Sequence, residues 1–491
     1  MEKIGRRGFM GVAGGAAAFT VPAVRAAAAN TDVPLLKIGV VSDIHLYRPQ
    51  IDPIFEKALL HYREQRVDGV LIAGDLVTGG RLAEMEAVAA TWFKVFPDDR
   101  GADGQHVERL FLLGNHDTNG ECYRTPELKG RLDEPAMKDE WFCLDRERHW
   151  ERLFHERYEP IFYKEVKGYR FVLRNWISGQ HRDRDTLPDF LKAHGTELKG
   201  EKPFFFAQHP HPQGTCCQSW TDGGGVRWID CGDDGVSTRL LSAYPNCIAF
   251  SGHSHTTLTD EHTIWQGGFT SVGCSCLHGY AFTFPGRENG NAHDDFRQQT
   301  PRPLTMPWLA FTAAKHGMLM EVYADRIVLH RRDFLHDCPL AADWTIPLPA
   351  PGTRPYAFAP RRMAAAAHPP QFAQDAQVSM EEKRLRDRAK VEKDMVRVSF
   401  PSIQSKDGAL RAHEFSVLAE TRIGDCTRTV VEKRVYSPGM LQPESFDLEP
   451  AFCTFAKEEL PLNRDVRFIV TPLDCWGNKG RPLLSAWRRF T

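Results

Sequence analysis

The sequence lacks the marks of several protein classes, and these absences narrow what the chain can be. Its twelve cysteines form no Cys-x-x-Cys pair, so a zinc site held by cysteine pairs is not predicted. A formal net charge of −2 argues against binding to nucleic acid or an anionic membrane through bulk charge. No apolar run reaches the ~20 residues that a membrane-spanning helix needs, so we expect no transmembrane anchor.

Residues 1–29 are predicted to be an export signal. Arg6-Arg7-Gly8-Phe9 resembles the core of a twin-arginine signal, and a weakly apolar run follows from Gly11 to Val24. The alanines of residues 26–29 then offer an Ala-x-Ala cleavage site. An ordinary secretory signal is the alternative interpretation. Either signal predicts an exported protein, periplasmic or extracellular, and the first predicts the twin-arginine export machinery as a partner.

The remaining chain divides into three parts, as its length of 491 residues leads us to expect. Apolar runs alternate with amphipathic segments over residues 33–345, which is typical of an α/β layered domain. Residues 346–394 are first Pro-rich and then densely charged, which predicts a linker. Residues 395–491 carry short alternating strands, which predict a small all-β sandwich whose last strands are similar to those of fibronectin type III domains.

Five short polar blocks follow apolar runs that predict buried strands within the first domain. Because ligands in α/β folds gather beyond the carboxyl ends of strands, the blocks are candidates for one site. Between them lie residues 118–170, 178–202 and 211–235, which we expect to be surface insertions around that site. In chain order the blocks are Asp43-Ile44-His45, Gly74-Asp75, Gly114-Asn115-His116-Asp117, Gln208-His209-Pro210 and Gly252-His253-Ser254-His255.

The side chains of these blocks suit one or two divalent metal ions bound by nitrogen and oxygen. Hydrolysis of a phosphate ester would use two such ions ~3.5–4 Å apart, because a hydroxide can then bridge them. Two ions so close need a shared anionic ligand, and Asp75 is the candidate. Asp43 and His45 are two residues apart, so an extended strand end would point both to one side. The same argument applies to His253 and His255.

Two side chains of the third block are candidates for roles other than metal binding. Asn115 offers a neutral carbonyl oxygen to a metal, whereas His116 and Asp117 are left over. A histidine beside the ions could protonate the leaving oxygen, and Asp117 could then fix the tautomer and orientation of His116.

The ordered blocks resemble the pattern of the calcineurin-like metallophosphoesterase superfamily over about Leu35 to Phe334. The resemblance implies a four-layer α/β/β/α sandwich and two divalent ions, with Mn, Fe, Zn or Co all admitted by the ligands. It implies that His116 is the acid that binds no metal, and that His209 is a ligand, although His211 lies two residues further on. The implied ligands are Asp43, His45, Asp75 and His255 for the first ion, and Asp75, Asn115, His209 and His253 for the second.

One position departs from a branch of this superfamily, the purple acid phosphatases. That branch has a metal-binding tyrosine three residues after the shared aspartate, where this chain has Thr78, which argues against a tyrosinate–iron site.

The signal and the C-terminal sandwich look like those of exported bacterial metallophosphoesterases. The favoured hypothesis is a binuclear metal-dependent enzyme that hydrolyses small-molecule phosphate mono- or diesters. The alternative is an exported binding or surface protein with a structural metal site, which would not need His116.

Overall fold

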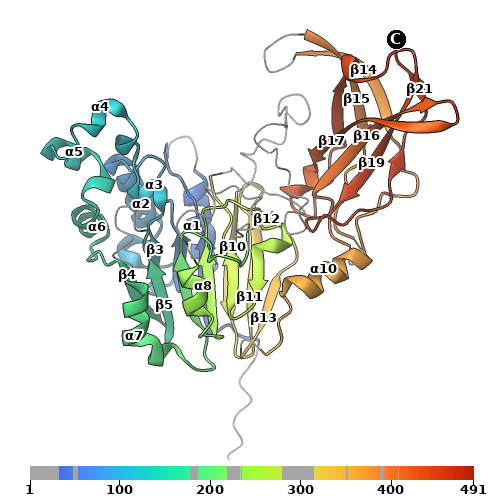
Figure 1. The fold of residues 1–491 in the computed structure, drawn as a ribbon. Helices are drawn as coiled ribbons and strands as arrows, with labels where there is room; N and C mark the ends of the chain where they lie inside the picture. The colour runs from blue at the N-terminus through green and yellow to red at the C-terminus, as the bar shows by residue number, and fades with distance from the viewer. Residues whose placement is uncertain are drawn as a thin grey trace, which may run out of the picture.

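The computed structural model describes residues 32–47, 53–176, 186–217, 233, 235–278, 315–349, 352–386, 392–406 and 409–491. The expected export signal, residues 1–29, lies outside the described residues. Within the described parts, no helix is both long and apolar enough to cross a membrane. Figure 1 shows the chain running from an α/β body to a strand-rich C-terminal region that carries the last residues.

The first sheet is mixed, and three neighbouring parallel strands form one side of it. Its order is β12-β11-β10-β1-β2-β3, with β13 paired to β11. β1, β2 and β3 run parallel, whereas β10 joins β1 in the antiparallel direction. The strands are β1 (Leu36–Val41), β2 (Gly69–Ala73), β3 (Glu108–Leu112), β10 (His316–Val322), β11 (Arg326–Asp333), β12 (Cys338–Pro339) and β13 (Trp344–Pro347).

Helices α1 (Ile54–Glu64) and α2 (Leu82–Val95) contribute to the same hydrophobic core as this sheet. α1 buries Phe55, Leu59 and Tyr62, whose three- and four-residue spacing places them on one helical face. The hydroxyl of Tyr62 donates a hydrogen bond to the carbonyl oxygen of Met318, 3.0 Å away. The helix is therefore tied to the sheet by packing and by a buried hydrogen bond.

The second sheet has the order β4-β5-β6-β7-β9-β8, and β5, β6, β7 and β9 are parallel neighbours. Along β5, Phe171 and Leu173 join the core of the first sheet, whereas Val172 joins the core under α7 (Leu187–Leu198) and α8 (Val236–Leu241). This alternation follows from the two-residue period of a strand. The sheet thus has two buried faces, while the complete four-layer order stays a prediction. Its strands are β4 (Ile161–Val166), β5 (Tyr169–Arg174), β6 (Phe204–Gln208), β7 (Cys247–Ser251), β8 (Ile264–Gln266) and β9 (Thr270–Gly273).

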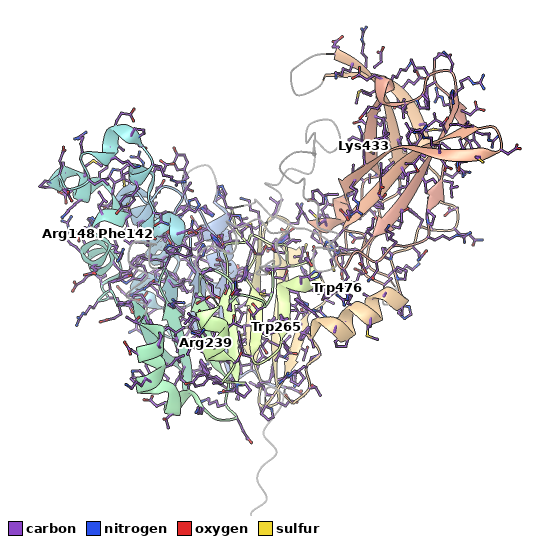
Figure 2. All side chains as sticks on the ribbon, viewed as in Figure 1. Phe142, Arg148, Arg239, Trp265, Lys433 and Trp476 are labelled. Carbon is purple, nitrogen blue, oxygen red and sulfur yellow. The ribbon has the colours of Figure 1, made fainter. Side chains whose placement is uncertain are left out.

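The expected surface insertion at residues 118–170 is in part structural core, so that expectation was too broad. Its second half supplies β4 and the start of β5, which the sequence pattern missed because charged residues interrupt the apolar ones. Figure 2 shows Phe142 and Arg148, which both precede β4; Phe142 is fully buried, whereas Arg148 is exposed and pairs with Asp139. The helices here are α3 (Asn115–Thr118), α4 (Pro126–Lys129), α5 (Pro135–Glu140) and α6 (Arg146–Phe154).

The C-terminal region consists of two antiparallel sheets that share one core. Val398 of the third sheet and Phe415 and Phe468 of the fourth belong to the same buried cluster. The likeness to fibronectin type III domains stays a prediction. The third sheet contains β14 (Ser379–Arg386), β15 (Glu392–Phe400) and β18 (Ala451–Ala456), and the fourth contains β16 (Glu414–Ile423), β17 (Cys426–Tyr436), β19 (Asp465–Leu473), β20 (Leu483–Leu484) and β21 (Arg488–Arg489).

The range expected to be a linker, residues 346–394, contains regular structure. β14 pairs with β15 over its whole length, so the third sheet begins inside that range. Helix α10 (Phe358–Ala367) also lies there, and its Phe358 packs against Trp476 with ring centroids 5.3 Å apart. Figure 1 shows α10 beside the junction of the two regions. Residues 379–386 at the start of the charged stretch therefore form an edge strand, and Glu381, Glu382 and Arg384 on it are exposed to water.

Candidate metal centre

The five polar blocks all follow the carboxyl ends of strands. Asp43 comes after β1 and Asp75 after β2, while Asn115 begins α3 behind β3. His209 follows β6, and His253 comes two residues after β7 ends. Because β1, β2 and β3 are parallel neighbours, and β6 and β7 are too, each set of ends meets at one sheet edge.

The first group of predicted ligands is Asp43, His45 and His255. Their ligand atoms lie within 4.8 Å of one another. Asp43 Oδ1 is 2.9 Å from His255 Nε2 and 3.7 Å from His45 Nε2, and the two imidazole nitrogens are 3.2 Å apart. One carboxylate oxygen and two ring nitrogens therefore converge, as the ligands of a single cation do.

Asp75 joins this group to the second one, which contains His209 and His253. The Oδ2 atom of Asp75 lies 3.6 Å from His45 Nε2 and 3.1 Å from His209 Nε2. Its other oxygen, Oδ1, accepts a hydrogen bond from the backbone N–H of His116 at 2.8 Å. One oxygen thus orients the carboxylate, and the other faces predicted ligands of both groups.

Three predicted ligands carry buried polar atoms that have no hydrogen-bond partner among the described residues. They are Asp43 Oδ1, Asn115 Oδ1 and His209 Nε2. The ion-pair contacts of Asp43 Oδ1 and His209 Nε2 are with His255 and Asp75, which are themselves predicted ligands. A buried polar atom without a hydrogen bond costs about 1–3 kcal/mol, which a bound cation would offset. Each is an atom through which its residue type binds metals. The residues present therefore fit the divalent ions that the family usually binds.

The orientation of His209 leaves its Nε2 atom available as a ligand. Its Nδ1 atom is 2.8 Å from the carbonyl oxygen of Ala73, and since a carbonyl only accepts, Nδ1 carries the proton. Gly74 makes this close approach possible, because a Cβ atom there would lie 2.4 Å from Nδ1. The same glycine has φ of +94°, a conformation that other residues rarely adopt.

The backbone at the site differs from the expected extended strand ends. Asp43, His45, Asp75, His253 and His255 all have φ between +46° and +65°. The two-residue spacing therefore does not put side chains on one side of a strand, and that expectation was wrong. His253 and His255 instead lie in different groups. Left-handed backbone at residues other than glycine costs about 1–2 kcal/mol each, and such strain gathers at functional sites.

Buried opposite charges shift the pKa values of the site. Burial raises the pKa of Asp75, but the imidazoles of His209, His45 and His116 together outweigh burial, and the net pKa lies well below its ordinary value. Burial lowers the pKa of His209, yet the carboxylates of Asp75 and Asp43 outweigh this effect and raise the pKa to about 9. Before a metal binds, His209 is therefore protonated at neutral pH, and a cation at Nε2 would displace that proton.

His116 and Asp117 do not interact as we expected. His116 Nδ1 is 2.7 Å from the carbonyl oxygen of Thr78, so Thr78 fixes its tautomer. Asp117 instead accepts hydrogen bonds from the backbone N–H groups of Gly114, Val77 and Leu76 at 2.7, 2.9 and 3.3 Å. The expectation that Asp117 orients His116 was therefore wrong, because the carboxylate is fully occupied by main-chain donors.

His116 itself lies beside the first group of ligands. Its ring centroid is 4.6 Å from that of His45, edge to face, and it belongs to a cluster with His45 and Asp75. With Nδ1 bound to a carbonyl, Nε2 is the nitrogen that remains for a substrate. His211, the alternative to His209, belongs to a different group, which it forms with Cys216 and Cys217.

Sequence reasoning missed two aromatic neighbours of the site. The ring of Trp176 lies 5.8 Å from His253 and 6.1 Å from His209, and that of His278 lies 5.2 Å from His45. Trp176 follows the end of β5, so the rule that found the other blocks would have found it had β5 been recognised.

Residues 36–257 match the model of the calcineurin-like phosphoesterase family. The chain therefore contains a calcineurin-like phosphoesterase domain, and the members of that family are generally metal-dependent phosphoester hydrolases. A comparison with curated proteins finds no match.

Several solved structures are similar at low identity. GAP50, the anchor in the inner membrane complex of Plasmodium, is 12% identical with a TM-score of 0.36, over 64% of this chain and 88% of its own. A predicted phosphoesterase from Streptococcus pneumoniae is 10% identical with a TM-score of 0.25, over 64% and 97%. Vacuolar Protein Sorting 29 from Cryptosporidium parvum is 11% identical with a TM-score of 0.28, over 63% and 97%. These scores are too low to support an inference about this chain.

Proposed function

We propose that the chain is an exported binuclear phosphoesterase that hydrolyses small-molecule phosphate mono- or diesters. The observation that carries the proposal is the position of Asp75 Oδ2, 3.6 Å from His45 Nε2 and 3.1 Å from His209 Nε2. A carboxylate oxygen between two groups of nitrogen ligands is what two neighbouring cations need to offset their repulsion.

The proposed ligands divide between two ions. Asp43, His45 and His255 would hold one, Asn115, His209 and His253 would hold the other, and Asp75 would contact both. When bound, two divalent ions would neutralise phosphate charge and lower the pKa of water from ~15.7 towards ~7. The buried oxygens of Asp43 and Asn115, which accept no hydrogen bond from the described residues, support this assignment.

His116 is proposed to assist the leaving group. Its Nδ1–H is committed to the Thr78 carbonyl, which holds the ring, and in the imidazolium form Nε2–H gives its proton to the departing oxygen and leaves the ring neutral. Trp176, whose ring lies beside His253 and His209, would restrict where the organic part of the ester can lie.

The test is a panel of phosphate monoesters and diesters, run on protein whose bound metals have been quantified. We expect turnover of aryl esters in at least one class and its loss after the metals are removed by a chelator. A protein that holds its metals but leaves the whole panel intact would contradict the proposal. That result would favour an exported binding or surface protein with a structural metal site.

A further inference from the structure

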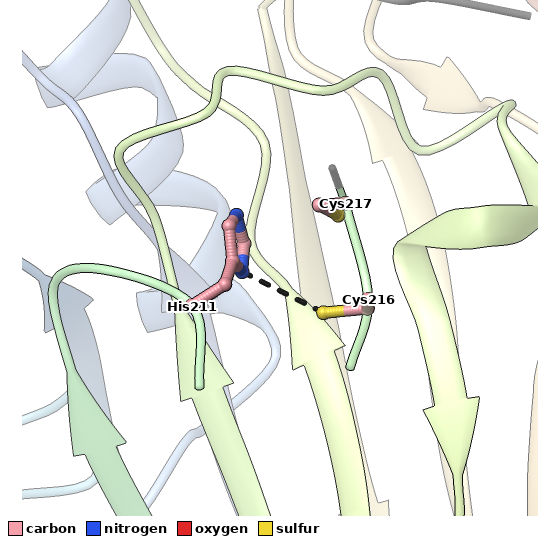
Figure 3. A group of neighbouring side chains, drawn as sticks. All are labelled: His211, Cys216 and Cys217. Atoms are coloured by element: carbon pink, nitrogen blue, oxygen red, sulfur yellow. Dashed lines mark hydrogen bonds between the residues drawn. The ribbon is translucent and has the colours of Figure 1, made fainter. Parts of the chain in front are cut away.

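A second cluster of metal-binding side chains lies next to the proposed centre and contains sulfur. Figure 3 shows His211, Cys216 and Cys217, with the hydrogen bond between His211 and Cys216 drawn as a dashed line. The ligand atoms of all three residues lie within 4.8 Å of one another. His211 is 4% exposed, Cys216 0% and Cys217 1%. The proposed phosphoesterase centre leaves these three residues without a role.

The distance between the donors suits a bound ion. His211 Nδ1 lies 3.5 Å from Cys216 Sγ. A tetrahedral ion with a metal–sulfur distance of ~2.3 Å and a metal–nitrogen distance of ~2.0–2.1 Å separates those two ligand atoms by about 3.6 Å. The side chains would therefore need little movement to enclose the ion.

The outer nitrogen of His211 has a fixed partner. His211 Nε2 is 2.7 Å from the hydroxyl oxygen of Ser254. When Nε2–H donates to that oxygen, the lone pair of Nδ1 faces Cys216 Sγ, which is the tautomer that a ligand through Nδ1 requires. Histidines that bind metals are commonly held in this way by a hydrogen bond from their second nitrogen.

The backbone is strained where the two thiols meet. Cys217 has φ of +53°, a left-handed conformation that is intrinsically unfavourable for cysteine. Space for its sulfur depends on Gly273 of β9, because a Cβ atom there would lie 2.5 Å from Cys217 Sγ. Strain of about 1–3 kcal/mol persists where surrounding structure or a ligand compensates for it.

We propose that His211, Cys216 and Cys217 bind a third cation, a thiophilic ion of the Zn(II) or Cu(I) type. Thiolate with imidazole selects these ions, whereas the ligands proposed for the phosphoesterase centre are nitrogen and oxygen atoms. Ser254, the hydrogen-bond partner of His211, stands between His253 and His255 in the sequence. The third ion would therefore stabilise the loop that carries His253 and His255, two of the proposed ligands of the phosphoesterase centre. The inference does not depend on whether that centre hydrolyses esters.

X-ray absorption at the metal edge tests this proposal directly, because none of the ligands proposed for the phosphoesterase centre supplies sulfur. Full-length protein is loaded with Zn(II), and in a second sample with Cu(I) under anaerobic reducing conditions. We expect a sulfur shell around bound zinc at about 2.3 Å, and a sulfur shell around copper if the site prefers Cu(I). The Cys216→Ser/Cys217→Ser double variant should lose one ion per chain together with the sulfur shell.

Two further variants separate this site from its neighbour. Asp75→Asn should lose ions held by nitrogen and oxygen but keep the sulfur shell. Cys276→Ser is the matched control, because Cys276 is a buried thiol that interacts with His255, and it should also keep the shell. If the double cysteine variant fails to fold, His211→Gln replaces it, with an expected loss of at least about 10-fold in zinc affinity against a chromophoric chelator.

Three results would overturn the inference. One is bound metal without any sulfur neighbour, and another is a sulfur shell that Cys276→Ser abolishes. The third is a Cys216–Cys217 disulfide that persists after treatment with reductant and metal, as detected by peptide mass spectrometry. Sulfurs joined in a disulfide would leave no thiolate for a metal.

Discussion

The imidazole of His116 donates a hydrogen bond from Nδ1 to the main-chain carbonyl oxygen of Thr78, 2.7 Å away. Thr78 therefore has a structural part in the site, although its side chain stands where a purple acid phosphatase would have a metal-binding tyrosine. The hydroxyl of Thr78 also donates to the carbonyl oxygen of His45, at 2.9 Å. One residue thus connects the proposed acid to a proposed metal ligand.

Replacing the proposed acid should slow turnover without removing the metals. We expect His116→Ala to lower kcat by about 10²–10⁴-fold, because the leaving oxygen then departs without a proton. The loss should be larger for alkyl phosphates, which are poor leaving groups, than for nitrophenyl phosphates. Rates over a leaving-group series, together with metal content, check this expectation. His106→Ala is the control, since His106 is exposed and precedes β3, whereas the site follows the carboxyl end of that strand.

An equal loss for good and poor leaving groups would show that His116 acts in some other way. A fall in metal content that matches the fall in kcat would show that His116 supports metal binding instead of proton transfer.

Asp117 should matter for stability and not for proton transfer. Asp117→Asn places an amide N–H₂ among three backbone donors, so we expect the free energy of unfolding to fall by about 2 kcal/mol. Denaturant unfolding measures the loss. The leaving-group dependence should stay that of the wild type, because His116 is held by Thr78. A changed dependence with unchanged stability would restore Asp117 as the residue that orients His116.

Gly74 should be required for both stability and the second group of ligands. Gly74→Ala introduces a left-handed alanine and a contact with His209 Nδ1 at 2.4 Å, so it should destabilise the chain and weaken metal binding. Gly104→Ala separates the two effects, since Gly104 also has positive φ, +75°, but open space around it. The control should cost about 1–2 kcal/mol and retain all metal. Equal metal loss in both variants would contradict the role of the close contact.

The stability of the contact between α10 and β11 should depend on the charge of Glu261. Glu261 pairs with Arg361 of α10 and with Arg331 of β11, the latter at 3.1 Å. Burial raises the pKa of Glu261, but the two guanidinium groups, first Arg361, outweigh burial and lower the pKa. Glu261→Gln should cost about 3 kcal/mol of unfolding free energy near pH 7, because it takes the shared carboxylate from the buried Arg331 and the half-buried Arg361.

The pH dependence of that cost has a definite sign. Because folding lowers the pKa of Glu261, its contribution is present above the ordinary carboxyl pKa of about 4.3 and is lost as the pH falls. The difference between wild type and Glu261→Gln should therefore shrink when denaturation is repeated under acid conditions. Glu382→Gln, on the exposed edge strand β14, should change stability by less than about 1 kcal/mol at either pH. A pH-independent difference would contradict the charge argument.

The strands and helices that carry the site could be predicted from the sequence more accurately than the local backbone geometry of the site could. The strand before Asp75 and the helix at residues 82–95 could be recognised from apolar spacing alone, because burial dictates that spacing. The left-handed backbone of the ligands could not be recognised. It depends on main-chain hydrogen bonds such as Asp43 N–H to the Gly74 carbonyl, which join segments far apart in the chain.

The partner of His116 was missed for a similar reason. A main-chain carbonyl exists at every residue, so no residue type marks Thr78 as the acceptor, whereas Asp117 has a side chain that invites the assignment. The edge strand β14 was hidden by its charges, since only one face of such a strand needs apolar side chains.

The measurement that tests the central claim most directly is the number of metal ions bound per chain by Asp75→Asn. It is made in the Cys216→Ser/Cys217→Ser background, so that an ion on sulfur does not enter the count. Asp68→Asn is the control, a buried aspartate at the other end of β2. A shared carboxylate predicts two ions before the substitution, two in the control, and fewer than one ion with no phosphoester hydrolysis in Asp75→Asn. Two ions and undiminished turnover in Asp75→Asn would contradict a binuclear centre built on Asp75.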